Sequence, residues 1–173
     1  IKYSIEKRKI DLIALSPTIS RKGVFDDGTL KDFIIGVYAT ERIVPRQLMI
    51  DYYLLNFESN RRKYNYWEGI DSRRVAGFRT FSQNRVMNYE AEVTYQFGRF
   101  NNLHINAYSL SADINIRIAA KTELSLGLAG NYVSGDKDNN DKQLNTYNTL
   151  FSKPLYGLTA PVGASNIVTI NPY

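Results

Sequence analysis

The stretch Asn88–Gly98, NYEAEVTYQFG, alternates between two kinds of side chain. One side of an extended chain carries Tyr89, Ala91, Val93, Tyr95 and Phe97; the other carries Glu90, Glu92, Thr94 and Gln96. Because successive side chains of a β-strand point to opposite faces, this pattern predicts a strand with one apolar and one polar face. Alternation alone leaves open whether the apolar face packs inside a soluble protein or turns outward.

The composition of the 173-residue chain narrows the class of protein. No run approaches the roughly 20 apolar residues of a transmembrane helix, whereas membrane strands need only about 9–11 residues and can be polar at every second position. The absence of cysteine excludes disulfide frameworks, thiolate nucleophiles and cysteine metal sites. The formal net charge of +5 is spread without a block of like charges, so we expect no nucleic-acid partner.

Period-two segments recur along the chain and predict about seven or eight strands in a single segment spanning residues 1–173. We expect these strands at residues 1–15, 32–44, 47–58, 73–83, 86–99, 102–118, 121–134 and 166–171. Most are longer than the roughly 5–6 residues of an average globular strand. The connections 16–31, 59–72 and 135–165 are long and the others short, and such asymmetry is typical of outer-membrane barrels.

Two all-β architectures fit these patterns. The first is a soluble antiparallel sandwich with its apolar faces inside. The second is an antiparallel up-and-down transmembrane β-barrel with its apolar faces outside. The polar faces carry Gly, Ser, Asn, Glu and Arg, which suits a crowded polar lumen, and Tyr64, Tyr66 and Trp67 cluster at a loop border as an interfacial aromatic girdle requires.

Two ordered sets of short motifs resemble a known family. The first runs from Arg74 to Gly98 and contains RVAGFR, YEAE and YQFG. The second begins with YVSGD at 132–136 and continues with NTYNTLF at 145–151, Tyr156-Gly157 and Asn166-Ile167. Over residues 70–170 these motifs resemble the alginate-export family of Gram-negative outer-membrane β-barrels. Tyr147 stands where that family usually has Phe, and Ile167 where Leu is common.

The resemblance implies a transport protein of the outer membrane of a Gram-negative bacterium, not an enzyme. It implies a channel or porin that passes a hydrophilic solute by diffusion, with an anionic saccharide or polysaccharide as the candidate. Seven or eight strands are too few for a barrel of the family's width, so we expect part of a larger barrel. Outer-membrane lipid, the solute and other envelope proteins are the expected partners.

Two alternatives stay open beside the channel. One is a soluble secreted β-sandwich that serves as a carbohydrate-binding module through its Tyr-rich surface. The other is a β-rich polysaccharide hydrolase or lyase. It ranks last because the sequence contains no Ser-His-Asp set, phosphate-binding loop or HExxH motif.

For a channel, the chemistry lies in the wall of the lumen. Arg79 is expected to point inward and to meet Glu90 and Glu92 of the next strand. Arginine guanidiniums held in such a ladder can pair with the carboxylates of an anionic saccharide. The competing interpretation of each residue is a structural salt bridge of the lumen. Four further candidates for the pore lining come from segments of ambiguous strand phase: Arg42, Arg74, Arg85 and Asp51.

No metal or cofactor is expected. Asp136, Asp138 and Asn140 have the opening spacing of a calcium loop, within GDKDNNDKQ at 135–143. However, Asp141 stands where the turn needs Gly, and Tyr147 where a bidentate Glu closes such a site, so a solvated loop is favoured over a loose calcium site. His104 is the only histidine and cannot form a usual zinc site without other soft ligands.

Overall fold

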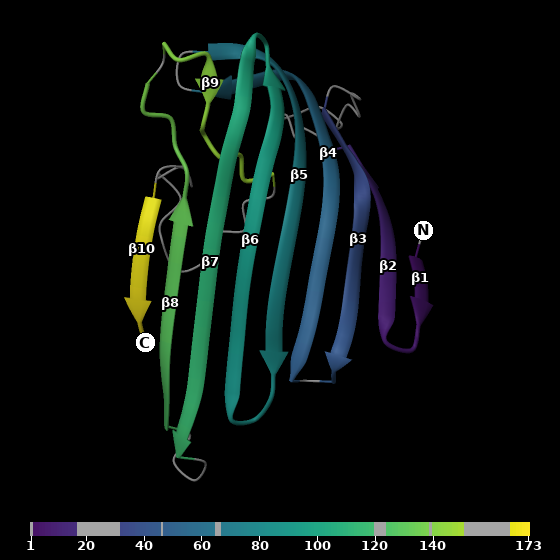
Figure 1. Cartoon of the computed structure of the whole chain (residues 1–173), viewed down its shortest axis with the longest axis vertical. Coiled ribbons are helices and arrows are strands. Elements are labelled where there is room, and N and C mark those ends of the chain that lie inside the picture. Colours follow the sequence, from purple (N-terminus) through teal and green to yellow (C-terminus); the bar gives the residue numbers. More distant parts are fainter. Residues whose placement is uncertain are drawn as a thin grey trace, which may run out of the picture.

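A computed structural model describes residues 2–16, 32–45, 47–64, 67–119, 124–138, 140–150 and 167–173. These residues form ten strands joined in one sheet (Figure 1). The strands are β1 (Lys2–Ile5), β2 (Arg8–Leu15), β3 (Asp32–Val44), β4 (Leu48–Tyr64), β5 (Trp67–Gln83), β6 (Met87–Phe100), β7 (Leu103–Ala119), β8 (Leu124–Val133), β9 (Gln143–Leu144) and β10 (Ile167–Pro172). Within the described ranges, no helix has the length and apolarity needed to span a membrane.

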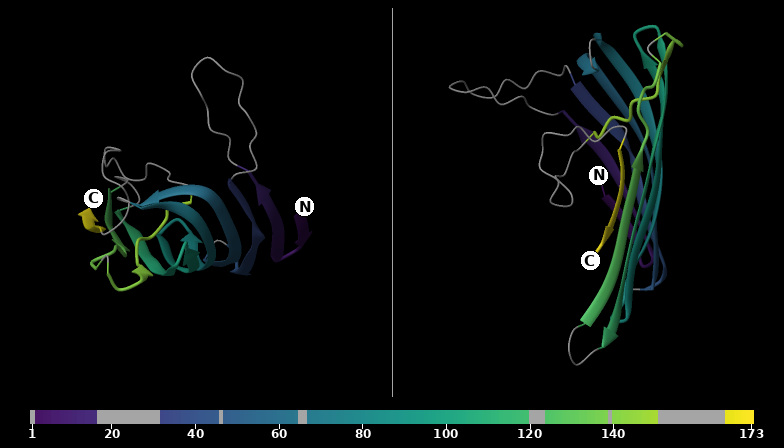
Figure 2. Two further views of the ribbon diagram at one scale, coloured as in Figure 1. Left: turned by 90° about the horizontal axis from the view of Figure 1, so that it is seen from above. Right: turned by 90° about the vertical axis from the view of Figure 1, so that its left-hand side faces the viewer.

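The order of strands in the sheet follows the chain. Strands β1 to β8 lie side by side in sequence order, β10 pairs with β8, and all these pairs are antiparallel. The short β9 pairs in parallel with β7 at His104 and Ile105, beyond the end of β8. The sheet curves like part of a barrel wall and is open, with β1 and β10 at its two edges (Figure 2). The all-β, up-and-down prediction is therefore confirmed.

The structure has ten strands where the sequence predicts seven or eight. The segment 1–15 is a hairpin that turns at Glu6-Lys7. Residues 59–72, predicted as a long loop, mostly continue the ladder between β4 and β5, which resumes after a bulge between Ser59 and Arg62. All connections at one end of the sheet are short, but the other end combines the long connections 16–31 and 134–166 with two tight hairpins.

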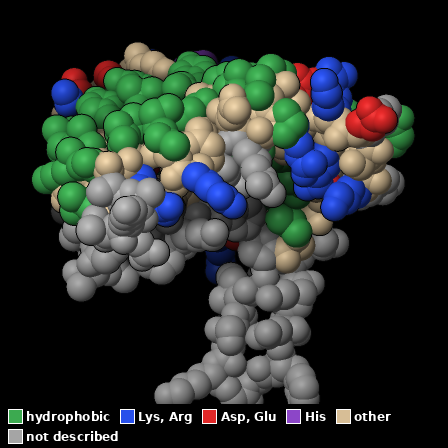
Figure 3. Space-filling model, turned by 90° about the horizontal axis from the view of Figure 1, so that it is seen from below, with side chains coloured by type: hydrophobic (Ala, Val, Ile, Leu, Met, Phe, Trp, Pro, Cys, Tyr) green, Lys and Arg blue, Asp and Glu red, His purple; other side chains and the backbone are tan. Residues whose placement is uncertain are grey.

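The outward, convex face of the sheet is apolar. Large hydrophobic side chains stand exposed along it, among them Leu54 (56% exposed), Val93 (50%) and Leu126 (63%). Seen along the strands, hydrophobic side chains gather over this side of the sheet (Figure 3). Within the described residues no second sheet packs against it, so the sandwich alternative lacks its second layer.

The concave face carries polar and charged side chains beside buried apolar ones such as Val75 and Phe100, and it buries charge. Arg73 and Gln96 are completely inaccessible, and Thr94 is 2% exposed. A water-soluble protein has the opposite arrangement, since charged residues are rarely buried and apolar ones are usually inside. Apolar outside and polar inside is the arrangement of a membrane barrel.

The apolar band has a limit on the outer face. Toward the end that carries the long connections, one cross-strand row is polar from β4 to β7, where it consists of Glu58, Ser72, Arg99 and His104, and it continues on β3 with Phe33. Below it, Tyr89 and Phe97 lie eight residues apart on β6, which is about 27 Å at about 3.4 Å per residue. A strand tilted by about 40° then crosses roughly 21 Å, close to the ~25 Å height of the apolar band of membrane barrels.

Candidate pore wall

Two neighbouring rows of side chains cross the concave face, and we call them the wall rows. The first row, by strand register from β3 to β8, contains Thr40, Asp51, Arg79, Glu92, Ser111 and Asn131. The second contains Arg42, Met49, Phe81, Glu90, Asp113 and Ala129. Both rows follow from period-two alternation, because residues of one phase in each strand meet on one face.

Arg79 joins the two wall rows. Its Nη2 donates to Glu90 Oε2 at 2.7 Å, and its Nη1 donates to Asp51 Oδ2 at 3.3 Å. The guanidinium also lies 4.5 Å from the ring centroid of Phe81. Arg79 therefore bridges carboxylates from two flanking strands and stacks on its own strand's aromatic ring.

Two stacked tyrosines hold the carboxylates of the first row. Tyr38 donates to Asp51 Oδ2 at 2.6 Å, and Tyr53 donates to Glu92 Oε1 at 2.6 Å. Their rings are 5.4 Å apart and nearly parallel. Since the single proton of Tyr53 goes to Glu92, the Thr94 hydroxyl 2.9 Å away donates to Tyr53.

The ring of Tyr53 lies over Gly77. A Cβ at position 77 would stand 2.0 Å from Tyr53 Cζ, so any larger residue would require the ring to move. Gly77 belongs to the RVAGFR motif quoted above. The close approach of the Tyr53 ring therefore explains why the motif has a glycine at this position.

A pocket of about 330 Å³ opens on the wall rows beside Arg79. Four adjacent strands supply its lining on the concave face: Arg79 and Phe81, Asn88 and Glu90, Ser111 and Asp113, and Ala129 and Asn131. Tyr173 donates to Asp113 Oδ1 at 2.8 Å. The pocket thus gathers one guanidinium, two carboxylates and several neutral hydrogen-bonding groups.

The structure brings most of the predicted pore-lining residues to one face. Arg79, Glu90, Glu92, Asp51 and Arg42 all belong to the wall rows. Glu90 bonds Arg79 as expected, whereas Glu92 bonds Tyr53 instead.

Arg74 and Arg85 lie elsewhere, and their assignment to the pore lining needs correction. Arg74 is exposed on the outer face, where it pairs with Asn56 and Phe97. β5 alternates without interruption from Arg73 to Arg79. Arg74 lies five residues before Arg79, an odd number, so its side chain points to the opposite face. Arg85 is exposed in the turn between β5 and β6, outside the ladder.

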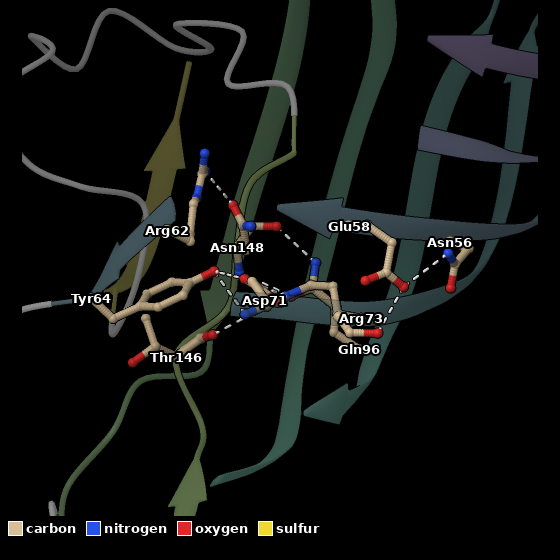
Figure 4. A network of polar contacts seen from close by, with 10 residues as sticks. Asn56, Glu58, Arg62, Tyr64, Asp71, Arg73, Gln96, Thr146 and Asn148 are labelled. Atoms are coloured by element: carbon tan, nitrogen blue, oxygen red, sulfur yellow. Dashed lines mark hydrogen bonds and ion pairs between the residues drawn. The ribbon is translucent and has the colours of Figure 1, made fainter. Parts of the chain in front are cut away.

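A second polar cluster lies on the same face nearer the end with the long connections (Figure 4). Its centre is an ion pair between Arg73 and Asp71, Nε to Oδ1 at 2.9 Å, with both side chains fully buried. Arg73 Nη2 donates to Tyr64 Oη at 2.7 Å, and Arg73 Nη1 donates to Gln96 Oε1 at 2.5 Å. The guanidinium thus has acceptors on every side, as a buried charge requires.

This cluster holds residues 143–150, which we call the inner strap. Gln96 Nε2 donates to the carbonyl oxygen of Asn148 at 2.7 Å, and Asn148 N donates to Gln96 Oε1 at 2.9 Å. Arg62 Nη2 donates to Asn148 Oδ1 at 2.8 Å. At its start, Leu144 packs with Phe100 and Ile105 in a small buried apolar cluster. The strap therefore crosses the concave face and narrows the space in front of β5 and β6.

Sequence reasoning missed the partners that complete these networks. For Tyr38, Tyr53 and Tyr64, strand phase was the only sequence feature that indicated a place on the concave face. Asn148 lies in the NTYNTLF motif, and Gln96 in YQFG, so the shared contact links two motifs that lie 52 residues apart. Only the three-dimensional structure joins them.

The loop 135–143 shows no metal site among its described residues, and no group of three His, Asp, Glu or Cys elsewhere in the described part of the chain is placed to hold one. Asp138 Oδ1 accepts from Asn140 N, and Asp141 Oδ1 accepts from Gln143 N, both at 2.9 Å. These are local turn contacts. Burial raises the pKa of the Asp136 carboxyl above its ordinary value.

Comparison with known proteins agrees with this arrangement. A family model described as alginate export matches residues 1–173, the whole chain. Comparisons with curated proteins and with solved structures gave no match. The family match extends the resemblance from residues 70–170 to the strands β1 to β4. On this match over its full length, the chain belongs to the alginate-export family.

Proposed function

We propose that this chain forms part of the wall of an outer-membrane channel and that a hydrophilic solute diffuses along its concave face. The match to the alginate-export family over the whole chain supports a transport function in the outer membrane. The observation that carries the proposal is the inverted polarity of the sheet. Exposed apolar side chains cover the convex face, while the concave face buries and displays charge.

The concave face suits a saccharide-type solute. The wall rows and their pocket offer carboxylates, amides and hydroxyls, which exchange hydrogen bonds with sugar hydroxyls as water does. The inner strap stands in front of the wall and limits the size of what passes. Both features favour slow, size-limited diffusion of a hydroxylated solute.

The family resemblance and the arginines of the polar face led us to expect a hydrophilic solute, with an anionic saccharide as the candidate. The guanidinium of Arg79 already has carboxylate partners in Glu90 and Asp51, so it offers a solute anion less than an unpaired arginine would. We therefore keep the broader class, a hydrophilic solute, in the proposal.

Reconstitution tests the proposal. The protein purified from outer membranes and inserted into planar bilayers should give stepwise conductance in KCl, and in liposomes it should admit small sugars while excluding large dextrans. Heat-modifiable mobility in gel electrophoresis would show that the inserted protein is folded. Folded, inserted protein that gives neither current nor sugar uptake would overturn the channel function.

The carbohydrate-binding module finds less support. Such a module needs a stable soluble fold, whereas this sheet exposes a continuous apolar face. Protein that remains monomeric in buffer without detergent would reverse this ranking.

A further inference from the structure

Two arginines stand close together on the outer face without a counter-ion, and we call them the outer arginine pair. Arg74 lies on β5 opposite Phe97, and Arg99 lies two residues beyond Phe97 on β6, opposite Ser72. Such diagonal neighbours on adjacent strands are about 7–8 Å apart. Both side chains are exposed, and neither makes a hydrogen bond or ion pair with any residue in the described ranges. Since like charges on neighbouring strands repel, an anion between the two guanidiniums would stabilise them.

The nearest carboxylate does not neutralise the pair. Glu58 on β4 is the diagonal neighbour of Arg74, since it lies opposite Ser72 in the ladder. Its Oε1 accepts hydrogen bonds from Asn56 Nδ2 at 3.2 Å and from Ser72 Oγ at 2.7 Å. Both donors are neutral, and Glu58 forms no ion pair with another described residue.

Cations also outnumber carboxylates around the pair. The buried cluster of Arg73 and Asp71 and its neighbour Arg62 belong to the concave face and are not counted. The other charged side chains in residues 58–64, 67–74 and 97–100 are Arg61, Lys63, Arg74 and Arg99 against Glu58 and Glu68.

The loop beyond β7 does not remove this excess. It carries two lysines and three aspartates, Lys137, Lys142, Asp136, Asp138 and Asp141. It joins the sheet through β9 on the far side of β7, which is two strand spacings or about 10 Å from β6 and more than the screening length of about 8 Å. With the loop included, cations still exceed carboxylates by one.

The outer arginine pair lies where the apolar band ends. The row next to Arg74 toward the middle of the sheet is apolar and aromatic, and it contains Val37, Leu54, Ala76, Tyr95 and Tyr108. The row of Arg99, on the other side, is polar from β4 to β7. The long connections leave from this end of the sheet, and in outer-membrane barrels they lie on the extracellular side. The two guanidiniums therefore stand at the level of the lipid headgroups of the outer leaflet.

A pocket of about 260 Å³ adjoins the pair. It begins at Asn106, which lies next to Phe97 in the row of Arg74. The exposed rings of Tyr108 and Tyr132, stacked with their centroids 5.6 Å apart, form one wall. Aromatic rings beside amides and carboxylates suit the C–H face and the hydroxyls of a sugar ring. The amides and charged groups of the lining are Asn106, Asn145, Lys137, Asp138 and Asp141.

We propose that the outer arginine pair and this pocket bind the headgroup of a phosphorylated glycolipid of the outer leaflet. The guanidiniums hold a phosphate, whose oxygens match the two-point fork of arginine, and the pocket holds a neighbouring sugar ring. The acyl chains of the same lipid lie along the apolar row below. This inference rests on the outer-membrane placement in the proposed function, and it does not depend on conduction.

The test is lipid binding by the protein folded in dodecyl maltoside micelles, measured by native mass spectrometry. The probes are lipid A, a phosphorylated glucosamine lipid, and phosphatidylglycerol, an anionic lipid without sugar. The wild type should bind lipid A more tightly, and Arg74→Gln/Arg99→Gln should weaken that binding at least about tenfold. Lys7→Gln/Arg85→Gln removes two exposed cations from turns at the opposite end of the sheet and should bind as the wild type does.

A second variant separates the sugar from the phosphate. Tyr132→Leu removes an aromatic wall of the pocket but keeps an apolar side chain, so it should weaken the binding of lipid A and leave phosphatidylglycerol unaffected. Equal binding of the two lipids by the wild type would overturn the glycolipid assignment. Equal lipid A binding by the arginine variant and its control, or displacement of lipid A by an equal concentration of inorganic phosphate, would overturn the site.

The channel function is tested separately. The arginine variant changes only the outer face and should keep the wild-type conductance in planar bilayers. Folded protein that binds lipid A as expected but gives no current would overturn the channel function and leave this inference intact.

Discussion

Gln96 and Asn148 exchange two hydrogen bonds across the concave face, Nε2 to the carbonyl oxygen at 2.7 Å and main-chain N to Oε1 at 2.9 Å. The two bonds have the pattern of one step of a β-ladder, but they join the side-chain amide of Gln96 to the main chain of Asn148. It fixes the inner strap on the strand that carries the alternating stretch Asn88–Gly98. The position of the strap therefore depends on one amide that is completely buried.

Replacing that amide should release the strap. Gln96→Ala leaves Asn148 N, its carbonyl oxygen and one donor of Arg73 unpaired, and each buried unpaired group costs about 1–3 kcal/mol. We expect lower stability toward urea and faster trypsin cleavage after Lys142, which is exposed beside the strap. Asn88→Ala, on the same strand and face but exposed, is the control. Equal cleavage rates in the two variants would contradict the anchoring role of Gln96.

Adjacent arginines on β5 should differ sharply in their effect on stability. Arg73→Met leaves the fully buried Asp71 without its counter-ion, and breaking a buried pair in this way costs about 3–5 kcal/mol. Arg74→Met changes an exposed side chain of the outer face and should cost within about 0.5 kcal/mol. Urea unfolding in detergent micelles measures both. Similar midpoints for the two variants would show that the face assignment of β5 is wrong.

Charge on the convex face should be costly only within the apolar band. Val93→Lys places an ammonium among exposed apolar side chains, where lipid contact costs about 2–4 kcal/mol near the middle of the bilayer. Val86→Lys, in the turn between β5 and β6, is the control with comparable exposure outside the band. Folding yields in lipid vesicles compare the two. If Val93→Lys folds as well as the control, lipid does not contact this face.

The glycine that ends the YQFG motif should not tolerate alanine. Gly98 has a φ of 143°, and a Cβ there would lie 2.2 Å from the carbonyl oxygen of Ser72. Gly98→Ala should therefore destabilise by more than about 1 kcal/mol. At Gly130 the added Cβ would meet only Thr169 O at 3.5 Å, so Gly130→Ala should be close to neutral. Thermal unfolding of both variants checks this difference.

Local features of the fold were predictable from the sequence. The alternation of β6 assigns Val93 and Thr94 to opposite faces. In the structure Val93 is exposed and Thr94 is buried. Strand phase also brings Arg79 to Glu90, because only the register of two adjacent strands has to be correct. By contrast, the extension of β4 to Tyr64 was not predictable, since the bulge after Ser59 interrupts the alternation.

The non-local contacts were out of reach. Arg73 meets the carbonyl oxygen of Thr146, 73 residues away, and no periodicity encodes such a contact. The phase of the strand around Arg74 is ambiguous in the sequence, and a shift of one residue moves a side chain to the other face, where the structure places Arg74. Polar residues stand on both faces around Arg74, in the middle of β5, so composition alone does not identify its face.

If the sheet is part of a membrane barrel, its convex face contacts lipid and its concave face contacts water. Leu110 and Ser111 are neighbours on β7 with opposite orientation, and the natural chain has no cysteine, so a single cysteine at either position can carry a nitroxide label. In lipid vesicles, collision with oxygen and with a water-soluble nickel chelate measures the surroundings of each label. We expect the label at 110 to be accessible to oxygen and the label at 111 to the nickel chelate. Equal access of the chelate to both labels, or the reverse pattern, would contradict it.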